Sequence, residues 1–257
     1  MIEFNLLFLW VVIGFLAQLI DGALGMAYGV ASTSALVSIG VYPAIASASV
    51  HTAKIFTSLA SGGAHFKIGN VRRDIVLSLV IFGVPGSILG AYLSTTMPFR
   101  PLGTLVGCIL LIMGLLILLK FESRRKLYFK TDKPPSIFLR TVGFSAAFID
   151  ALGGGGWGPI ATTTLVAEDF EPSKAIGSVN FAEFFITLST TLAFIILLGP
   201  RNFYWRVIVG LVIGGLICAP LAAFACKKLP QRILSALVGI TVITLSGRIL
   251  LISFGLL

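Results

Sequence analysis

Residues 14–59 recur 129 positions later as residues 143–188, with 17 of the 46 aligned positions identical. Both copies begin Gly-Phe-x-Ala-x-x-Ile-Asp, and the final acid is Asp21 in the first copy and Asp150 in the second. Each acid stands inside an apolar run that is followed by glycines. The chain is therefore a tandem of two similar halves, and any fold must contain two similar structural units.

The composition places these units in a membrane. Hydrophobic residues make up 57% of the chain and charged residues 11%, whereas about a quarter of the residues of a soluble domain are charged. The mean hydropathy is +1.02. Lipid admits only helices or closed barrels, and the apolar residues lack the alternation of barrel strands. We therefore expect an all-α polytopic membrane protein.

Apolar segments of about 20 residues are long enough to cross the hydrocarbon core as helices. The sequence predicts five segments in each half. In the first half they lie near 4–20, 24–40, 44–64, 75–97 and 101–119, and in the second near 137–150, 158–168, 174–198, 207–226 and 233–255. The first pair in each half is broken by glycines, so it either crosses the membrane or forms a re-entrant hairpin. We predict repeats over 1–121 and 137–257, joined by a cytoplasmic linker over 122–136, in one integrated membrane domain.

Basic loops set the expected orientation. The loops 65–74, 120–136, 168–174 and 227–232 fall on one side and carry most of the lysines and arginines, whereas the other side keeps Arg100, Arg201 and Arg206. By the positive-inside rule the basic side is cytoplasmic, which places both termini outside. Each half crosses the membrane five times, or three times if its first pair is re-entrant, and both numbers are odd. The halves are therefore expected to have opposite orientations, as in many secondary transporters.

The composition does not favour a nucleic-acid partner, a metal site or a removable signal peptide. The net charge of +9 is spread over short loops, so we expect no nucleic-acid partner. The cysteines Cys108, Cys218 and Cys226 lie in apolar segments without metal-ligand spacing, and we expect neither a metal site nor a cofactor. The first segment lacks the basic start and the cleavage site of a signal peptide, so we expect it to remain as a helix.

The second half contains four consecutive glycines followed by Trp157, Gly158 and Pro159. This run predicts a helix break and a new helix from about Pro159, whose free N–H groups would form an anion site inside the membrane. Close packing of helices is the alternative role of the glycines. The expected substrate contacts are Gly153, Gly154, Gly155, Gly156, Trp157, Thr162 and Thr163, with Gly25, Ser32 and Thr33 in the first half.

Asp21 and Asp150 stand just before the two breaks. A carboxylate there either caps the next helix or, as an acid within the membrane, couples transport to protons or another cation. Both roles stay open at this point.

The third segment of each half carries a polar stripe. The 129-residue shift maps His51 onto Asn180 and Lys54 onto Glu183. Lys54 and Glu183 are expected to neutralise each other across the repeat interface, because an unpaired charge there is costly. This contact is either a structural ion pair or a functional one, in which Lys54 attracts an anionic substrate and Glu183 takes part in proton coupling. His51 is then a candidate proton carrier and Asn180 a candidate substrate contact.

Several of these features together resemble the TauE/SafE family of sulfite exporters, over essentially the whole chain. The likeness is most specific over 148–159 and 177–183, and it includes Pro43, Pro172 and the run 48–54. The first copy departs from the family's glycine-rich pattern at 23–29, and Lys54 is another departure. The resemblance implies an inner-membrane secondary transporter for sulfite or a small organosulfonate anion, coupled to an ion gradient.

We therefore predict a carrier that exports a small oxyanion by alternating access between the halves, with proton or sodium coupling. A passive anion channel is the alternative. With two histidines, no His-Glu-x-x-His motif and no nucleotide-binding loop, the chain lacks the equipment of an enzyme or an ATPase. A non-transporting scaffold would not explain the polar stripes. Apolar surfaces that face lipid and those of a homodimer have the same signature, so the sequence leaves a homodimer open.

Overall fold

The computed structural model describes residues 2–24, 26, 28–120, 136–168, 170–225 and 231–256. These residues form ten α-helices and one short 3-10 turn, with no strand among them. The helices are α1 (Ile2–Leu24), α2 (Tyr28–Ser38), α3 (Pro43–Lys67), α4 (Arg73–Thr96), α5 (Phe99–Lys120), α6 (Ser136–Gly153), α7 (Trp157–Ala167), α8 (Pro172–Leu198), α9 (Trp205–Ala225) and α10 (Gln231–Ser253). The all-helical fold class and the ten segments are confirmed.

Four helices in the described part of the chain are long and apolar enough to cross a membrane: Arg73–Thr96, Arg100–Leu119, Ser136–Gly153 and Ser173–Leu198. The helix α3 is as long as these, but it carries the buried polar residues His51 and Lys54. Pro43 and Pro172 occupy the first turns of α3 and α8. Backbone N–H groups in the first turn have no partner within the helix, so the N–H that proline lacks is not needed there.

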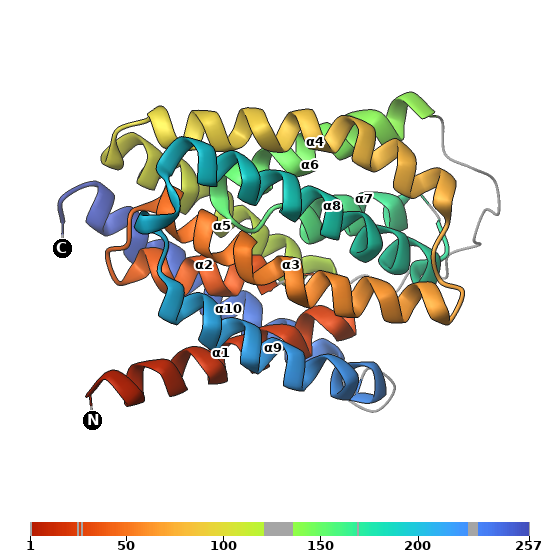
Figure 1. The fold of residues 1–257 in the computed structure, drawn as a ribbon, viewed down its shortest axis with the longest axis horizontal. Helices are drawn as coiled ribbons and strands as arrows, with labels where there is room; N and C mark the ends of the chain where they lie inside the picture. The colour runs from red at the N-terminus through yellow and green to blue at the C-terminus, as the bar shows by residue number, and fades with distance from the viewer. Residues whose placement is uncertain are drawn as a thin grey trace.

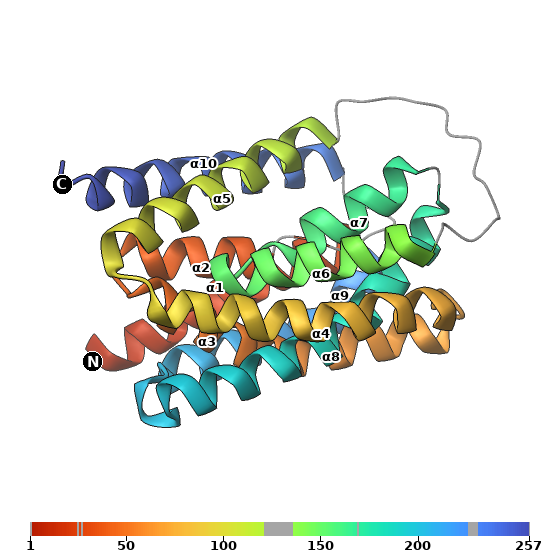
Figure 2. The ribbon, with the colours of Figure 1, turned by 90° about the horizontal axis from the view of Figure 1, so that it is seen from above.

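The first two helices of each half form a hairpin. In Figure 2, α1 enters the bundle from the end that carries the N-terminus and α6 enters from the opposite end, and the shorter helices α2 and α7 run back toward those ends. The helices α2 and α7 have 11 residues each, too few to cross the hydrocarbon core, which favours the re-entrant alternative; that alternative stays a prediction. The helix after the second break begins at Trp157, two residues earlier than the predicted Pro159.

The helices pair mainly between the two halves. In Figure 1, α1 lies along α9 and α4 along α6, while α3 packs against α8 and α5 against α10. Exchanging each helix for its equivalent in the other half leaves this set of pairs unchanged. The inverted relation of the halves stays a prediction, and this pairing supports it.

Glycines bring the main pairs into backbone contact. A Cβ on Gly14 of α1 would lie 2.5 Å from the Leu211 carbonyl oxygen of α9. Its equivalent in the second copy, Gly143 of α6, meets the Leu79 carbonyl oxygen of α4 at the same 2.5 Å. Both interfaces therefore depend on the absence of a side chain, as is common between membrane helices.

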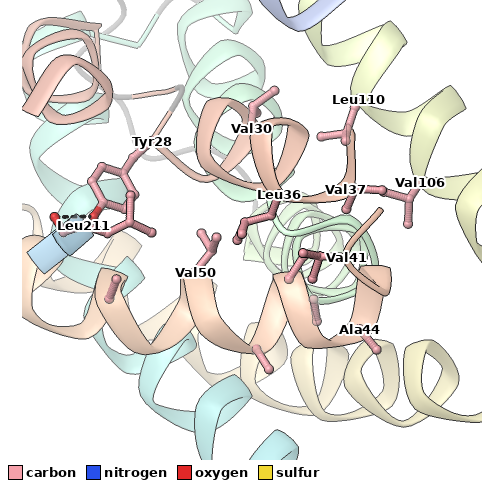
Figure 3. Close-up of a cluster of buried hydrophobic side chains, with 14 of the residues drawn as sticks. Tyr28, Val30, Leu36, Val37, Val41, Ala44, Val50, Val106, Leu110 and Leu211 are labelled. Carbon is pink, nitrogen blue, oxygen red and sulfur yellow. Dashed lines mark hydrogen bonds between the residues drawn. The ribbon is translucent and has the colours of Figure 1, made fainter. Parts of the chain in front are cut away.

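The buried apolar residues form two clusters, and each contains helices from both halves. Figure 3 shows part of the larger cluster, where Tyr28 of α2 lies beside Leu211 of α9 and Val37 of α2 lies near Val106 of α5. The smaller cluster joins Leu79 of α4 to residues of α6, α7 and α8. The predicted domain boundaries at 121 and 122 lie outside the described residues, and those at 136 and 137 fall at the start of α6.

The start of α1 and the end of α10 lie at one end of the bundle, and the start of α6 lies at the other (Figure 1). The turn between α3 and α4 is at the same end as the start of α6. This arrangement agrees with the predicted grouping of the loops, while the side of the membrane that each end faces stays a prediction.

Candidate functional site

The turn between α6 and α7 crosses α2 inside the bundle. Thr33 Oγ1 of α2 donates a hydrogen bond of 2.9 Å to the Gly154 carbonyl oxygen. A Cβ on Gly155 would lie 2.6 Å from the Val30 backbone nitrogen, and a Cβ on Gly29 would lie 2.5 Å from the Gly154 oxygen. Gly154 also has a positive φ of 72°, which a glycine adopts without strain. In this structure the glycines allow two backbones to cross, and direct contact with a substrate stays a prediction.

Beside this crossing, four ionisable side chains from three helices meet. Lys54 of α3 places Nζ 2.8 Å from Glu183 Oε1 of α8 and 3.3 Å from Asp150 Oδ2 of α6. His51, one turn before Lys54, places Nε2 3.0 Å from the same Asp150 oxygen. All four side chains are at least nine-tenths buried. We call His51, Lys54, Asp150 and Glu183 the charge cluster.

The hydrogen-bond partners of His51 show which of its ring nitrogens carries a hydrogen. Nδ1 lies 2.8 Å from the Ser47 carbonyl oxygen, which only accepts, and the Ser47 hydroxyl donates to the Ala151 carbonyl oxygen at 2.8 Å. Nδ1 must therefore be the donor. If His51 carries this one proton only, Nε2 is an acceptor, and it would face the acceptor oxygen of an ionised Asp150. A hydrogen bond between Nε2 and Asp150 therefore needs one more proton. At 3.0 Å from Asp150 Oδ2, the hydrogen bond requires that proton, carried by His51 or by Asp150.

Charge counting agrees with this assignment. With the proton on the His51–Asp150 pair, the charge cluster contains two positive and two negative charges, or one of each, and is neutral. Without it, the net charge is −1. An uncompensated charge at this depth is expensive, so the neutral form fits the buried position.

Asp21 has a different environment from its equivalent Asp150. Its Oδ1 accepts a hydrogen bond of 3.2 Å from the backbone nitrogen of Tyr28, the first residue of α2. A carboxylate in this position satisfies a free N–H group and interacts favourably with the helix dipole. Asp21 is also within electrostatic range of Lys54. Of the two roles expected for Asp21, the geometry supports capping.

Tyr28 was missed by the sequence reasoning, although the 129-residue shift maps it onto Trp157. Both rings are buried at the start of a hairpin's second helix. The Tyr28 hydroxyl donates to the Leu211 carbonyl oxygen at 3.0 Å, and Trp157 Nε1 donates to the Val179 carbonyl oxygen at 3.1 Å. Each aromatic residue thus anchors a hairpin to a neighbouring helix.

The remaining predicted contacts are distributed around the two hairpins. Gly153 packs near the Ile109 side chain, and a Cβ on Gly156 would lie 2.8 Å from the Asp150 backbone nitrogen. Thr162 is fully buried, and Thr163 donates to carbonyls of its own helix, including that of Pro159. Gly25 lies outside the described residues.

Two predicted contacts have polar atoms that are buried without a hydrogen-bond partner in the described part of the chain. They are Ser32 Oγ of α2 and Asn180 Nδ2 of α8. A buried donor without a partner costs about 1–3 kcal/mol, so such groups need an explanation. A hydroxyl and an amide N–H are both suitable donors to an oxyanion.

The described residues contain no group of three or more His, Cys, Asp or Glu side chains arranged to hold a metal ion. The contacts of Asp150 with His51 and Lys54, across 99 and 96 residues, were not predicted. No local pattern marks a contact at that separation, whereas the contact between Lys54 and Glu183 follows from the repeat.

Comparisons with known proteins identify the family. A family model described as Sulfite exporter TauE/SafE matches residues 10–249. The chain is 41% identical over 245 residues to the "Probable membrane transporter protein YtnM" of Bacillus subtilis (strain 168), covering 93% of this chain and 81% of that relative. No solved structure matches significantly. These similarities indicate a membrane transporter rather than an enzyme. The chain, with its helical bundle and its buried charges, belongs to the sulfite exporter TauE/SafE family of multi-pass membrane proteins.

Proposed function

We propose that the protein is a secondary transporter that exports sulfite, a small organosulfonate or a similar oxyanion by alternating access between its halves. The observation that carries this proposal is the charge cluster at the contact of α3, α6 and α8, next to the crossing of the two hairpins. Intramembrane ionisable groups are costly and are typical of transport pathways. The family description supplies the substrate class.

The cluster suggests how anion and proton binding are linked. Lys54 is the permanent cation of the cluster, and both of its contacts are carboxylates. Protonation of Glu183 or Asp150 weakens these contacts and makes the ammonium group available to an oxyanion. Conversely, an anion that occupies Lys54 raises the proton affinity of the carboxylates it replaces. Proton and anion therefore bind cooperatively, and we propose that they move together in one direction.

Protons fit this role better than sodium. A sodium site needs several oxygen ligands around one point, as hard cations do. In the cluster, Lys54 Nζ lies between the Glu183 and Asp150 oxygens, so a bound cation would meet a positive charge. A proton needs only one of these oxygens.

The orientation proposed from the sequence completes the description. The basic loops face the cytoplasm and the termini face outward, in the inner membrane. A dianion such as sulfite that leaves with one proton still carries one net negative charge, so a membrane potential that is negative inside favours its outward movement, which agrees with export.

Reconstitution into lipid vesicles tests the proposal. Vesicles are loaded with sulfite, thiosulfate, an organosulfonate or a carboxylate, and efflux is followed under imposed proton and sodium gradients. We expect saturable efflux of sulfite or a sulfonate that depends on the proton gradient and not on sodium, and that is lost in Lys54→Gln. A reversed gradient should concentrate the substrate in the vesicles.

Two outcomes would contradict this function. Flux that rises linearly with concentration, and never accumulates substrate against a gradient, would indicate a channel. Efflux that is driven by sodium and insensitive to protons would exclude the proposed coupling.

A further inference from the structure

A second candidate binding site lies away from the charge cluster, on the outside of the bundle. It is a hollow of about 330 Å³ between the end of α3, the start of α4 and the middle of α8, and we call it the groove. Its volume lies within the range of small-ligand pockets, roughly 300–1,000 Å³. Aliphatic and aromatic side chains line it, together with one charged residue. The residues that matter for its chemistry are Phe66, Val76, Val80, Phe181, Phe185 and Arg73.

The groove is charged at one end and apolar along its length. Arg73 is the first residue of α4, at the end of a membrane-crossing helix. Val76 and Val80 follow at intervals of three and seven residues, so they lie below Arg73 on one face of the helix. Seven residues of α-helix cover about 10 Å. A ligand along this face would meet a cation at the membrane surface and apolar side chains deeper in the bilayer.

Arg73 is available for an anion, unlike its neighbour Arg72. The Arg72 guanidinium binds Asp74 through two hydrogen bonds of 3.2 and 2.7 Å. Arg73 instead stacks on the ring of Phe66, 5.6 Å from its centroid, and forms no ion pair with a carboxylate among the described residues. Stacking holds the guanidinium plane but leaves its N–H groups free to donate.

The walls of the groove face lipid. Leu77, which also lines it, is 60% exposed, and Phe66 and Phe185 are 43% and 39% exposed. In a membrane protein, large apolar side chains exposed on the outside of a helical bundle contact acyl chains. The groove is also at the end of the bundle where the basic loops lie, the proposed cytoplasmic side, whose leaflet is rich in anionic lipids.

We propose that this groove binds one anionic phospholipid. Arg73 binds the phosphate of the headgroup, and one acyl chain lies along Val76 and Val80 against Phe181 and Phe185. Phe181 and Phe185 are on the same helix as Glu183 of the charge cluster, so the lipid contacts a helix that carries the proposed coupling residue. The lipid site does not depend on the identity of the transported anion.

Native mass spectrometry of the full-length protein, purified in detergent, tests this site. The protein is titrated with phosphatidylglycerol and, in parallel, with phosphatidylcholine of the same acyl chains. We expect one phosphatidylglycerol to bind more tightly than phosphatidylcholine. Arg73→Gln should lower phosphatidylglycerol affinity about fivefold, the effect of one cation near a membrane surface, and should remove most of the preference.

Arg140→Gln is the matched control. Arg140 is exposed and stacks on Phe82 at 5.2 Å, an arrangement like that of Arg73 on Phe66, but it does not line the groove. It should keep the preference for phosphatidylglycerol. Val80→Trp fills the apolar part of the groove. It should lower the affinity for both lipids without changing the preference for one headgroup.

The proposal fails if the wild-type protein binds both lipids equally, or if Arg140→Gln loses as much preference as Arg73→Gln. Competition by soluble glycerol phosphate at the concentration of the lipid would also contradict it, since the headgroup alone would then suffice. A dimer in which the groove is covered, and to which no lipid binds, would show that a second copy of the chain is the occupant.

Discussion

Asp21 and Asp150 occupy equivalent positions in the two halves, but their surroundings differ. Both face the backbone nitrogen at the start of the following helix, Tyr28 for Asp21 and Trp157 for Asp150, but only Asp150 also contacts the side chains of His51 and Lys54. The difference arises from the partners that the other half provides. The repeat places Asn180 and Glu183 where the first half has His51 and Lys54.

Duplication thus supplied a nearly symmetric scaffold, and a few substitutions made the site asymmetric. The glycine contacts are the same in both halves, since Gly14 and Gly143 meet a helix backbone at the same distance. The charges are not the same, because His51 and Lys54 are both on α3 and the acid Glu183 is on α8. If the charge cluster is the transport site that we propose, having both basic groups on one half lets it respond to the relative movement of the halves.

The largest effect should come from reversing the charge of one member of the central pair. Lys54→Glu places three acids together, and Glu183→Lys places two lysines together. Each should lower the free energy of unfolding by about 3–5 kcal/mol or more, the cost of an uncompensated buried charge. Thermal unfolding in detergent, followed by circular dichroism, measures the loss.

The double exchange of Lys54 and Glu183 should restore more than half of this loss. Recovery should be incomplete because Asp150, 3.3 Å from Lys54, would then face a glutamate. Strictly additive losses would show that the two residues do not interact in the membrane.

The two aspartates should respond unequally to the same substitution. Asp150→Asn removes a charged hydrogen-bond partner of both His51 and Lys54, and should cost about 1.5–3 kcal/mol. Asp21→Asn keeps an oxygen that accepts from Tyr28, and asparagine caps helices about as well as aspartate, so the cost should be a few tenths of a kcal/mol. Denaturation midpoints of the two variants, compared side by side, test this; equal losses would mean that the two sites are more alike than the structure shows.

The hairpin crossing should be sensitive to a single methyl group. Gly155→Ala puts a Cβ within 2.6 Å of the backbone of Val30, which has no flexible side-chain end to move, and should cost about 1–3 kcal/mol. Gly63→Ala is the control, because its Cβ would meet nothing within 4 Å and alanine favours the helix. If both substitutions leave stability and efflux unchanged, the two hairpins do not cross as described.

The smallest structural effect and a specific functional one are expected from Glu183→Gln. The amide keeps an oxygen for Lys54 but does not titrate. Since protonation of a carboxylate makes Lys54 available, the apparent substrate affinity of the wild type should rise as the pH falls. The variant should show a flatter dependence on pH. Initial efflux rates from vesicles, recorded against substrate concentration at a series of pH values, measure this pH dependence. The same pH profile in the variant and the wild type would assign Glu183 a purely structural role.

Much of this arrangement follows from short-range patterns. Hydropathy located all ten helices to within a few residues, because lipid requires every backbone group to be paired within a helix. The break before Trp157 was evident because four glycines are unfavourable in a helix. The contact of Lys54 with Glu183 was predicted because the repeat places both residues at one depth, and the structure brings them to 2.8 Å.

The sequence alone therefore determined the class of protein, the duplicated plan and the pairing of one lysine with one glutamate, since these depend on composition and periodicity. Only the tertiary structure decided that Asp150 joins His51 and Lys54, that Asp21 caps a helix, and that Gly154 and Gly155 meet the backbone of α2. These contacts depend on how helices distant in the chain cross, and the crossing follows from side-chain packing of the whole bundle rather than from any local pattern.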